Sequence, residues 1–301
     1  MGLVDGRIVV VTGAGGGLGR AHALAFAAEG ASVVVNDYGV QLDGTPGDSA
    51  AAQAVVDEIT ALGGTAVANG ADVADWAQAE AMVRQAVDTF GGLDVLVNNA
   101  GFLRDRMLAN MSEDEWDAVI RVHLKGHFAP MRHAAAYWRA ESKNGRQRQA
   151  RVVNTSSGAG LQGSVGQGNY SAAKAGIATM TLVAAAEMGR FGVTANAIAP
   201  VARTRMTETT FAEMMDTGAE SFDAMAPENV SPLLVWLGST ESGHVTGRVF
   251  ELEGGKVALG DGWRHGTPAD KGARWEPSEL GAVVDKLIAD AVPGEAVYGA
   301  G

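Results

Sequence analysis

The stretch that decides the fold is VVVTGAGGGLGRAHALAF, residues 9–26. Its valines form a short apolar run typical of a buried strand, and Gly13, Gly17 and Gly19 follow where the backbone must turn tightly and a helix must begin, with Leu18 between the last two. A helix N-terminus attracts phosphate through its free amides and its dipole. Glycines also mark ordinary turns, so the prediction of a pyrophosphate site depends on the strand before them and the helix after them.

The same alternation continues along the chain. Apolar runs such as ASVVVND, LDVLVNNAG, ARVVNTSS, VTANAIAP and GRVFELEGG alternate with helix-length segments. This pattern predicts a Rossmann-type doubly wound α/β fold, with about seven parallel strands and helices on both faces. Such a sheet binds ligands at the carboxyl ends of its strands. Residues 1–255 are predicted to form the cofactor-binding and catalytic domain, and residues 256–301 an extension packed on it.

Composition excludes several classes of protein. The 301 residues carry a net charge of −12 and no cysteine. The acidic balance disfavours nucleic acid and anionic membranes as partners, and the absence of thiols suits a reducing cytoplasm. We expect no signal peptide, membrane span or metal site. The basic stretch RAESKNGRQRQAR, residues 139–151, is predicted to be a solvated loop.

Polar residues that end the strands indicate the cofactor. Asp37 ends the second apolar run, about twenty residues after the glycines. A carboxylate there can accept hydrogen bonds from both ribose hydroxyls and would repel a 2′-phosphate, so NAD is favoured over NADP; an exposed turn aspartate is the alternative. Further residues that follow strands are predicted to line the same edge: Asp72, Val73, Asn99, Ala100 and Gly101.

The segment GNYSAAKAGIATM, residues 168–180, places Tyr170 and Lys174 one helical turn apart on the same face. A free phenol has a pKa of about 10 and is a poor base at neutral pH. A nearby ammonium favours the phenolate, so we expect Lys174 to lower the pKa of Tyr170. The tyrosine could then take a proton from a substrate alcohol.

Together the glycine spacing, the NNAG segment (98–101) and the Tyr-x-x-x-Lys pair resemble the short-chain dehydrogenase/reductase family over about residues 5 to 255. The resemblance implies that Ser157, rather than neighbouring Ser156, is the catalytic serine, and that Lys174 holds the cofactor ribose. It also assigns Pro200 and Thr204 to the nicotinamide end of the cofactor site. In the family the helix that carries the tyrosine packs against its symmetry mate, which implies a homodimer or homotetramer.

One position departs from the family pattern. His123, in RVHLKG, stands where most members have an asparagine that links the lysine to solvent through a water. Three interpretations of this histidine follow: the chain lacks activity, the histidine transfers protons in place of the asparagine, or it is an ordinary histidine of the core. A narrower resemblance, in RVHLKG, GQGNYSAAKAG and RMTET, is to the (3R)-hydroxyacyl-CoA dehydrogenase unit of the peroxisomal multifunctional β-oxidation enzymes and its stand-alone bacterial relatives, which also have histidine there.

These observations predict an NAD-dependent enzyme that interconverts a secondary alcohol and a ketone, with a 3-hydroxyacyl-CoA carrying a fatty or sterol side chain as substrate. A 3-oxoacyl reductase, a hydroxysteroid dehydrogenase and a non-catalytic NAD-binding regulator are the alternatives. The methionine-rich segment 206–226 is either a lid over the substrate or an ordinary amphipathic helix. Four cations of the extension could bind CoA phosphates: Lys256, Arg264, Lys271 and Arg274.

Overall fold

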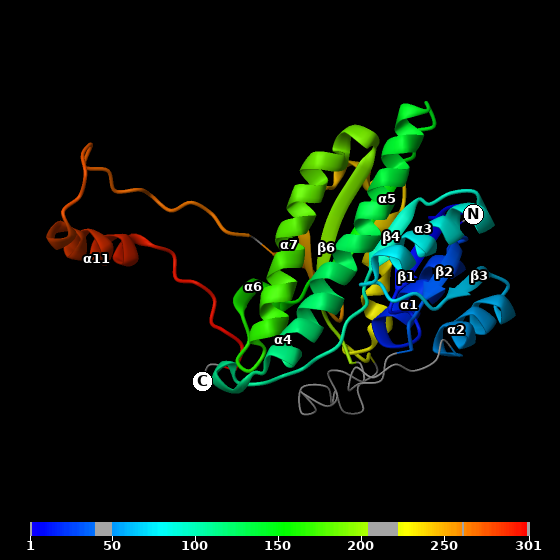
Figure 1. Ribbon diagram of the computed structural model, residues 1–301, viewed down its shortest axis with the longest axis horizontal. Helices are drawn as coiled ribbons and strands as arrows, with labels where there is room; N and C mark the ends of the chain where they lie inside the picture. The colour runs from blue at the N-terminus through cyan, green and yellow to red at the C-terminus, as the bar shows by residue number, and fades with distance from the viewer. Residues whose placement is uncertain (1, 40–49, 204–221, 261, 300–301) are drawn as a thin grey trace.

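The computed structural model describes residues 2–39, 50–203, 222–260 and 262–299. They form one eight-stranded sheet in the order β3-β2-β1-β4-β5-β6-β7-β8 (Figure 1). The strands are β1 (Ile8–Thr12), β2 (Ser32–Asn36), β3 (Thr65–Asn69), β4 (Val95–Asn98), β5 (Ala150–Thr155), β6 (Val193–Val201), β7 (Val249–Glu253) and β8 (Lys256–Leu259). All pairs are parallel except β7 with β8. The doubly wound α/β prediction is confirmed, with one strand more than the seven expected.

Helices cover both faces of this sheet (Figure 1). One face packs against α1 (Gly17–Ala28), α2 (Ala50–Ala61) and α10 (Ser231–Gly238), and the other against α3 (Trp76–Phe90), α5 (Gly126–Lys143) and α7 (Gly168–Met188). Val9 and Val11 contribute to the first core and Val10 to the second. Strands buried on both sides need continuous apolar runs, which is why β1 and β2 are nearly all valine.

Shorter elements connect these layers. They are α4 (Glu113–Ile120), a π-helical turn (Arg121–Lys125), α6 (Gly158–Gln162), α11 (Leu280–Asp290) and the 3₁₀ turns Leu108–Asn110, Gly189–Phe191, Pro227–Asn229, Glu241–His244 and Pro277–Glu279. Helix α4 begins with a capping box, in which the Ser112 hydroxyl and the Glu115 carboxylate each accept a hydrogen bond from the other residue's backbone amide. The chain then passes through the π turn directly into α5, so α4 and α5 form one nearly continuous rod.

Strand order reverses direction between β1 and β4. From β1 the chain adds β2 and β3 on one side, and then returns to add β4 on the other. The connections that leave the carboxyl ends of β1 and β4 therefore diverge and leave a crevice between them. This crevice is the place where a doubly wound sheet binds its ligand.

The C-terminal extension contributes the eighth strand. Strand β8 pairs antiparallel with β7, and the chain then leaves the body as an arm, residues 262–297, that carries α11 (Figure 1). None of the residues of α11 is buried. The chain returns at Tyr298, which forms a bridge with Ser164. The sequence predicts that residues 256–301 pack on the domain. In the structure the described part of this extension contacts the domain near its start, through β8, and near its end, through Tyr298.

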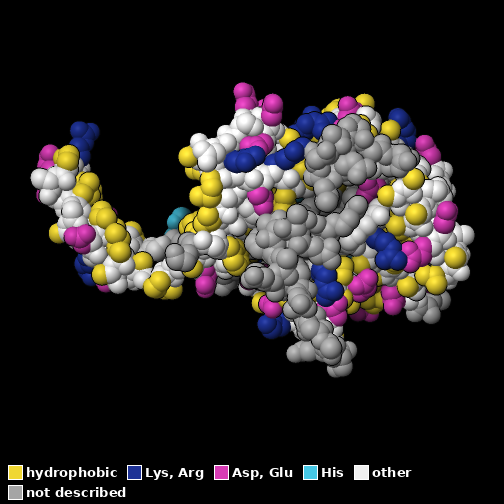
Figure 2. All heavy atoms as spheres, turned by 90° about the horizontal axis from the view of Figure 1, so that it is seen from below, with side chains coloured by type: hydrophobic (Ala, Val, Ile, Leu, Met, Phe, Trp, Pro, Cys, Tyr) yellow, Lys and Arg dark blue, Asp and Glu magenta, His cyan; other side chains and the backbone are white. Residues whose placement is uncertain are grey.

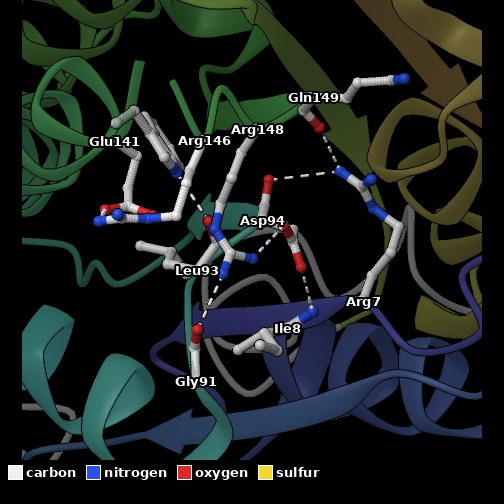
Figure 3. A network of polar contacts seen from close by, with 10 residues as sticks. Arg7, Ile8, Gly91, Leu93, Asp94, Glu141, Arg146, Arg148 and Gln149 are labelled. Atoms are coloured by element: carbon white, nitrogen blue, oxygen red, sulfur yellow. Dashed lines mark hydrogen bonds and ion pairs between the residues drawn. The ribbon is translucent and has the colours of Figure 1, made fainter. Parts of the chain in front are cut away.

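The basic stretch 139–151 lies at the amino end of the sheet, and Figure 3 shows its contacts. Arg146 pairs with Glu141, whereas Arg148 donates to the Asp94 carboxylate at 2.9 Å and to the Gly91 carbonyl at 2.8 Å. Arg151 belongs to β5 and is buried. The prediction of a solvated loop is therefore wrong for Arg148 and Arg151, because β5 begins inside the stretch and draws these cations into internal contacts.

Two structural properties of residues 2–39, 50–203, 222–260 and 262–299 concern membranes and metals. None of the helices there combines the length and the apolar character needed to cross a bilayer. The same residues hold no cluster of three or more side chains able to ligate a metal ion.

Asp94 connects β1 to the basic stretch through hydrogen bonds. Its carboxylate accepts hydrogen bonds from the Ile8 amide at 2.9 Å and from Arg148 (Figure 3). Asp94→Ala should lower the free energy of unfolding in urea by about 2 kcal/mol, because it leaves a half-buried amide and a guanidinium without their acceptor. The exposed Asp88→Ala is the control. Equal midpoints for the two variants would show that this network contributes nothing to stability.

Candidate active site

The loop after β1 packs directly on the segment after β4. Gly13 has φ +62°, and a Cβ there would lie 2.7 Å from the Cα of Ala100. A Cβ at Gly19 would lie 2.1 Å from the Gly13 carbonyl oxygen. Any side chain at these two positions would push the helix from its loop or the loop from β4. The structure thus places Gly13, Gly17, Leu18 and Gly19 together at the start of α1, at the crevice.

Thr12 and Asn99 hold this contact in place. The Thr12 hydroxyl oxygen accepts hydrogen bonds from the backbone amides of Asn99 at 2.9 Å and Ala100 at 3.2 Å. The Asn99 side-chain amide donates in turn to the carbonyls of Thr12 at 3.0 Å and Gly13 at 3.2 Å. Asn99 therefore braces the loop, and its side-chain N–H groups are engaged there. Sequence reasoning missed Thr12, although its place directly before Gly13 was a signal.

Asp37 lies at the rim of the crevice. One carboxylate oxygen accepts from the Gly15 amide and the other from the Gly39 amide, each at 2.8 Å. These two amides orient the carboxylate, and its remaining lone pairs can accept further hydrogen bonds. Asp37 is thus a half-buried residue fixed to the glycine loop, and not a free turn aspartate.

The second predicted acidic position has a different environment. One Asp72 oxygen accepts from the Ala74 amide at 2.9 Å, and the other pairs with Arg121 at 2.5 Å. Val73 is buried, and its Cγ2 would lie 2.7 Å from a Cβ at Gly126. The Asp72 carboxylate is therefore committed to an ion pair, and Val73 fixes the start of α5.

Ser157, Tyr170 and Lys174 meet beyond the end of β5. Ser157 caps α6, where its hydroxyl oxygen accepts from the Ala159 amide at 3.2 Å, and it also hydrogen-bonds the Tyr170 phenol. The Lys174 ammonium lies 5.4 Å from the centroid of the Tyr170 ring and donates to the Thr155 carbonyl at 2.6 Å. The Ser156 hydroxyl instead donates to the Lys174 carbonyl at 2.8 Å. The geometry thus favours Ser157 over Ser156 as the serine that acts together with Tyr170, in agreement with the spacing in the sequence.

The proton affinities of this group differ from expectation. Burial raises the pKa of Tyr170 to about 12, against a smaller lowering by the Ser157 hydrogen bond. Burial also lowers the pKa of Lys174 to about 7. The expectation that Lys174 lowers the pKa of the phenol is wrong for the chain by itself, because desolvation penalises both charged forms. A phenolate here needs a further cation.

His123 packs against Tyr170, the predicted catalytic tyrosine. Its ring meets that of Tyr170 edge-on, with centroids 5.2 Å apart, and covers Gly101, where a Cβ would lie 2.2 Å from His123 Cε1. Its Nε2 lies 3.0 Å from the Phe102 amide nitrogen and 2.7 Å from the Phe102 carbonyl oxygen, and the tautomer decides which contact is a hydrogen bond. The ring thus fixes the turn after β4.

The charge of His123 excludes one of its predicted roles. Burial, with a smaller contribution from Lys174, lowers the pKa of His123 to about 3. The ring is therefore neutral near neutral pH, and the hypothesis that it gains and loses protons there is wrong for the chain by itself.

Sequence reasoning also missed His127, which is fully buried one turn further along the chain. Its backbone carbonyl accepts a hydrogen bond from the Asn98 side chain at 3.3 Å.

The remaining predicted residues are placed only in part. Pro200 lies near the carboxyl end of β6, on the same edge of the sheet as the glycine loop. Thr204 and the methionine-rich segment up to residue 221 lie outside the described residues, so their roles stay predictions. Of the cations suggested for CoA, Lys256 pairs with Glu253 and Lys271 with Glu279 on the surface of the extension.

The fold and this constellation define an oxidoreductase. The family model for short chain dehydrogenases matches residues 7–215, and the chain belongs to the short-chain dehydrogenase/reductase family. The chain is therefore an enzyme that acts on CH–OH groups.

Relatives narrow the class. The chain is 47% identical over 298 residues to the hydroxyacyl-CoA dehydrogenase ChsB1 of Mycobacterium tuberculosis, covering 96% of this chain and 91% of that protein. It is 44% identical over 282 residues to the mouse peroxisomal multifunctional enzyme type 2, covering 94% of this chain and 34% of that longer protein. A crystal structure of a short chain dehydrogenase from Mycobacterium avium is 68% identical, with a TM-score of 0.90, and covers 99% of this chain and 100% of that one.

Burial of Lys174 makes stability depend on pH. The unfolded chain keeps the lysine proton up to pH 10.5, whereas the folded chain loses it near a pKa of about 7. Between these values the unfolded chain binds more protons, so the free energy of unfolding should rise with pH, by at most about 1.4 kcal/mol per unit. Lys174→Met should remove this rise in urea titrations from about pH 7 to about pH 9.

Two features make that experiment specific. The exposed Lys125→Met should keep the rise. The buried histidines His22 and His123 have pKa values of about 3, so their contribution falls below pH 6.5, outside the window. Parallel curves for wild type and Lys174→Met would contradict a depressed lysine pKa.

Proposed function

We propose that the chain catalyses the NAD-dependent oxidation of (3R)-hydroxyacyl-CoA to 3-oxoacyl-CoA, with a fatty or sterol side chain as the acyl part. The observation that carries the proposal is the group Ser157, Tyr170 and Lys174 at the crevice where the glycine loop meets β4. The names of the relatives support the acyl-CoA substrate, since ChsB1 is called a hydroxyacyl-CoA dehydrogenase.

The chain's own residues suit a dinucleotide. Three of the four residues in front of α1, Gly13, Gly15 and Gly16, are glycines, so backbone amides there can approach a pyrophosphate. Asp37 offers oriented carboxylate oxygens to an adenosine ribose and would repel a 2′-phosphate, which supports NAD over NADP. Lys174 uses one N–H for Thr155 and, when protonated, has two more to donate, which a nicotinamide ribose can accept.

Ser157, which caps α6, and Tyr170 of α7 carry out the proton transfer in this proposal. The Ser157 hydroxyl holds the substrate oxygen beside Tyr170, and Tyr170 Oη takes the hydroxyl proton as the C–H bond breaks. When bound, the oxidised nicotinamide supplies the hydride acceptor and a positive charge. Because burial holds the phenol pKa near 12, the tyrosine depends on neighbouring cations to act as a base. His123 keeps the ring in position through its edge-on contact.

The oligomeric state and the location of the protein are also part of the proposal. We infer a homodimer or homotetramer, because α7 exposes Leu182 and Val183 on the side turned away from the sheet, and α5 exposes Phe128. Exposed apolar side chains on these neighbouring helices suit a helix-to-helix interface between copies. Size-exclusion chromatography with light scattering decides between monomer, dimer and tetramer. The absence of cysteine supports a cytoplasmic location.

The first test is the rate of NADH formation with (3R)- and (3S)-hydroxyacyl-CoA thioesters, run in parallel with NAD and NADP. Turnover of the 3R thioesters with NAD is expected. Turnover with NADP alone would favour a 3-oxoacyl reductase. A reaction confined to free steroid alcohols would favour a hydroxysteroid dehydrogenase.

Tyr170→Phe separates an enzyme from a regulator. The substitution removes the group assigned to take the substrate proton, so kcat should fall by about a thousandfold or more while the Kd for NAD changes little. Fluorescence titration with NADH checks the binding. Tyr137→Phe, a half-buried tyrosine on α5, is the control. Activity retained by Tyr170→Phe would refute the assigned base.

Asp37→Ser tests the choice of cofactor. The substitution removes the repelling carboxylate and frees the amides of Gly15 and Gly39 to face a 2′-phosphate. The ratio of kcat/KM for NAD over NADP should drop by about a hundredfold. Asp57→Ser on the outer face of α2 should leave that ratio unchanged. A ratio unaltered in both variants would mean that Asp37 does not meet the ribose.

A further inference from the structure

The residues on either side of the C-terminal arm contact α6, the short helix capped by Ser157, or the loop after it, and Figure 1 shows the end of the chain returning to this place. Just before the arm, a Cβ on Gly260 would lie 3.0 Å from Leu161 Cδ1. At its end, Tyr298 pairs with the loop that follows α6. The arm itself projects into solvent with hydrophobic side chains along it (Figure 2). Tyr298, which follows Ser157 by more than a hundred residues in the sequence, therefore returns to the predicted catalytic serine.

The backbone fixes the position of Tyr298. Its amide donates to the Gly163 carbonyl at 3.2 Å, and its carbonyl accepts from the Val165 amide at 2.9 Å. The neighbouring Val297 lies over Gly163, with methyl carbons 3.5 and 3.7 Å from a Cβ placed there. These two hydrogen bonds and the apolar contact hold Tyr298 in an isolated bridge beside residues 163–165.

The ring of Tyr298 lies on Gly158, the residue directly after Ser157. A Cβ on Gly158 would be 2.8 Å from Tyr298 Oη and 3.0 Å from its Cε2. A residue other than glycine at 158 would displace the ring. Tyr298 is 46% exposed, so the part of the ring that does not meet Gly158 faces solvent at the site.

Tyr298 approaches Ser157 from the side away from the dinucleotide residues. The glycine loop, Asp37 and Asn99 belong to β1, β2 and β4, on one side of β5 in the sheet. Tyr298 instead lies near Glu251 and Glu253 of β7, on the other side, and these carboxylates, after burial, raise its pKa. The phenol therefore stays neutral, and the acidic surroundings disfavour the phosphates of CoA. An uncharged acyl chain suits this place.

We propose that Tyr298 is a specificity-determining residue whose ring forms the wall of the substrate site beside Ser157 and contacts the acyl chain. This inference rests on the proposed hydroxyacyl-CoA dehydrogenase activity. An aromatic wall adds contact area for chains that extend past the reacting carbons, and none for a chain that ends there. Tyr298 thus selects long or bulky acyl groups over short ones.

The experiment compares kcat/KM for a long-chain (3R)-hydroxyacyl-CoA with that for (3R)-hydroxybutyryl-CoA. Tyr298→Ala should lower the long-to-short ratio about tenfold or more, mainly through KM for the long chain. Tyr298→Phe, which keeps the ring, should retain the wild-type ratio. Val292→Ala, in the exposed part of the arm, is the matched control. An unchanged or increased ratio in Tyr298→Ala overturns the proposal.

Hydrogen exchange separates this proposal from the proposed function. In Tyr298→Ala the ring no longer covers Gly158, so the amides of α6 should exchange faster than in wild type, and Val292→Ala should match wild type. If wild type oxidises no hydroxyacyl-CoA but exchange is faster, the proposed function fails while the placement of Tyr298 stands, and the ratio is then measured on the secondary alcohols that react. Unchanged exchange overturns the placement, whatever the substrate.

Discussion

The contact between the loop after β1 and the backbone after β4 is the constraint on which the site depends. Gly13 meets Ala100 at a distance that admits no side chain, and Gly19 meets the Gly13 carbonyl in the same way. Thr12 and Asn99 bond across the junction. This junction opens the crevice, orients the start of α1 and places Gly101 where the His123 ring can cover it. From there His123 reaches Tyr170.

Burial controls the chemistry of the catalytic group. A phenol with a pKa of about 12 and an amine with a pKa of about 7 are both neutral over part of the range in which enzymes work. In the chain by itself, burial disfavours both the phenolate and the ammonium, because a low dielectric penalises each charged form. A positive charge added at the crevice would favour the phenolate. Such coupling ties proton transfer to occupancy of the cofactor site.

Much of the fold and of the catalytic group followed from sequence, because their signals are local. The valine runs of β1 and β2, the glycines before α1, and Tyr170 and Lys174 one turn apart are each read within a few residues. The pKa values were not predictable, because desolvation of Tyr170 and Lys174 depends on α4, α6 and the π turn that cover them. Arg148 and Arg151 were misjudged for the same reason, since their partners are distant in sequence.

The sequence by itself determined the class of fold and the family, and it predicted the reacting residues, since the strand–helix alternation and the short motifs are read directly along the chain. Only the tertiary structure decided which groups surround them. Asp37 is held by Gly15 and Gly39, His123 is a neutral ring against Tyr170, and Tyr298 returns from the far end of the chain to Gly158. Contacts of this kind join residues with no fixed separation in sequence, and packing of the whole domain sets them.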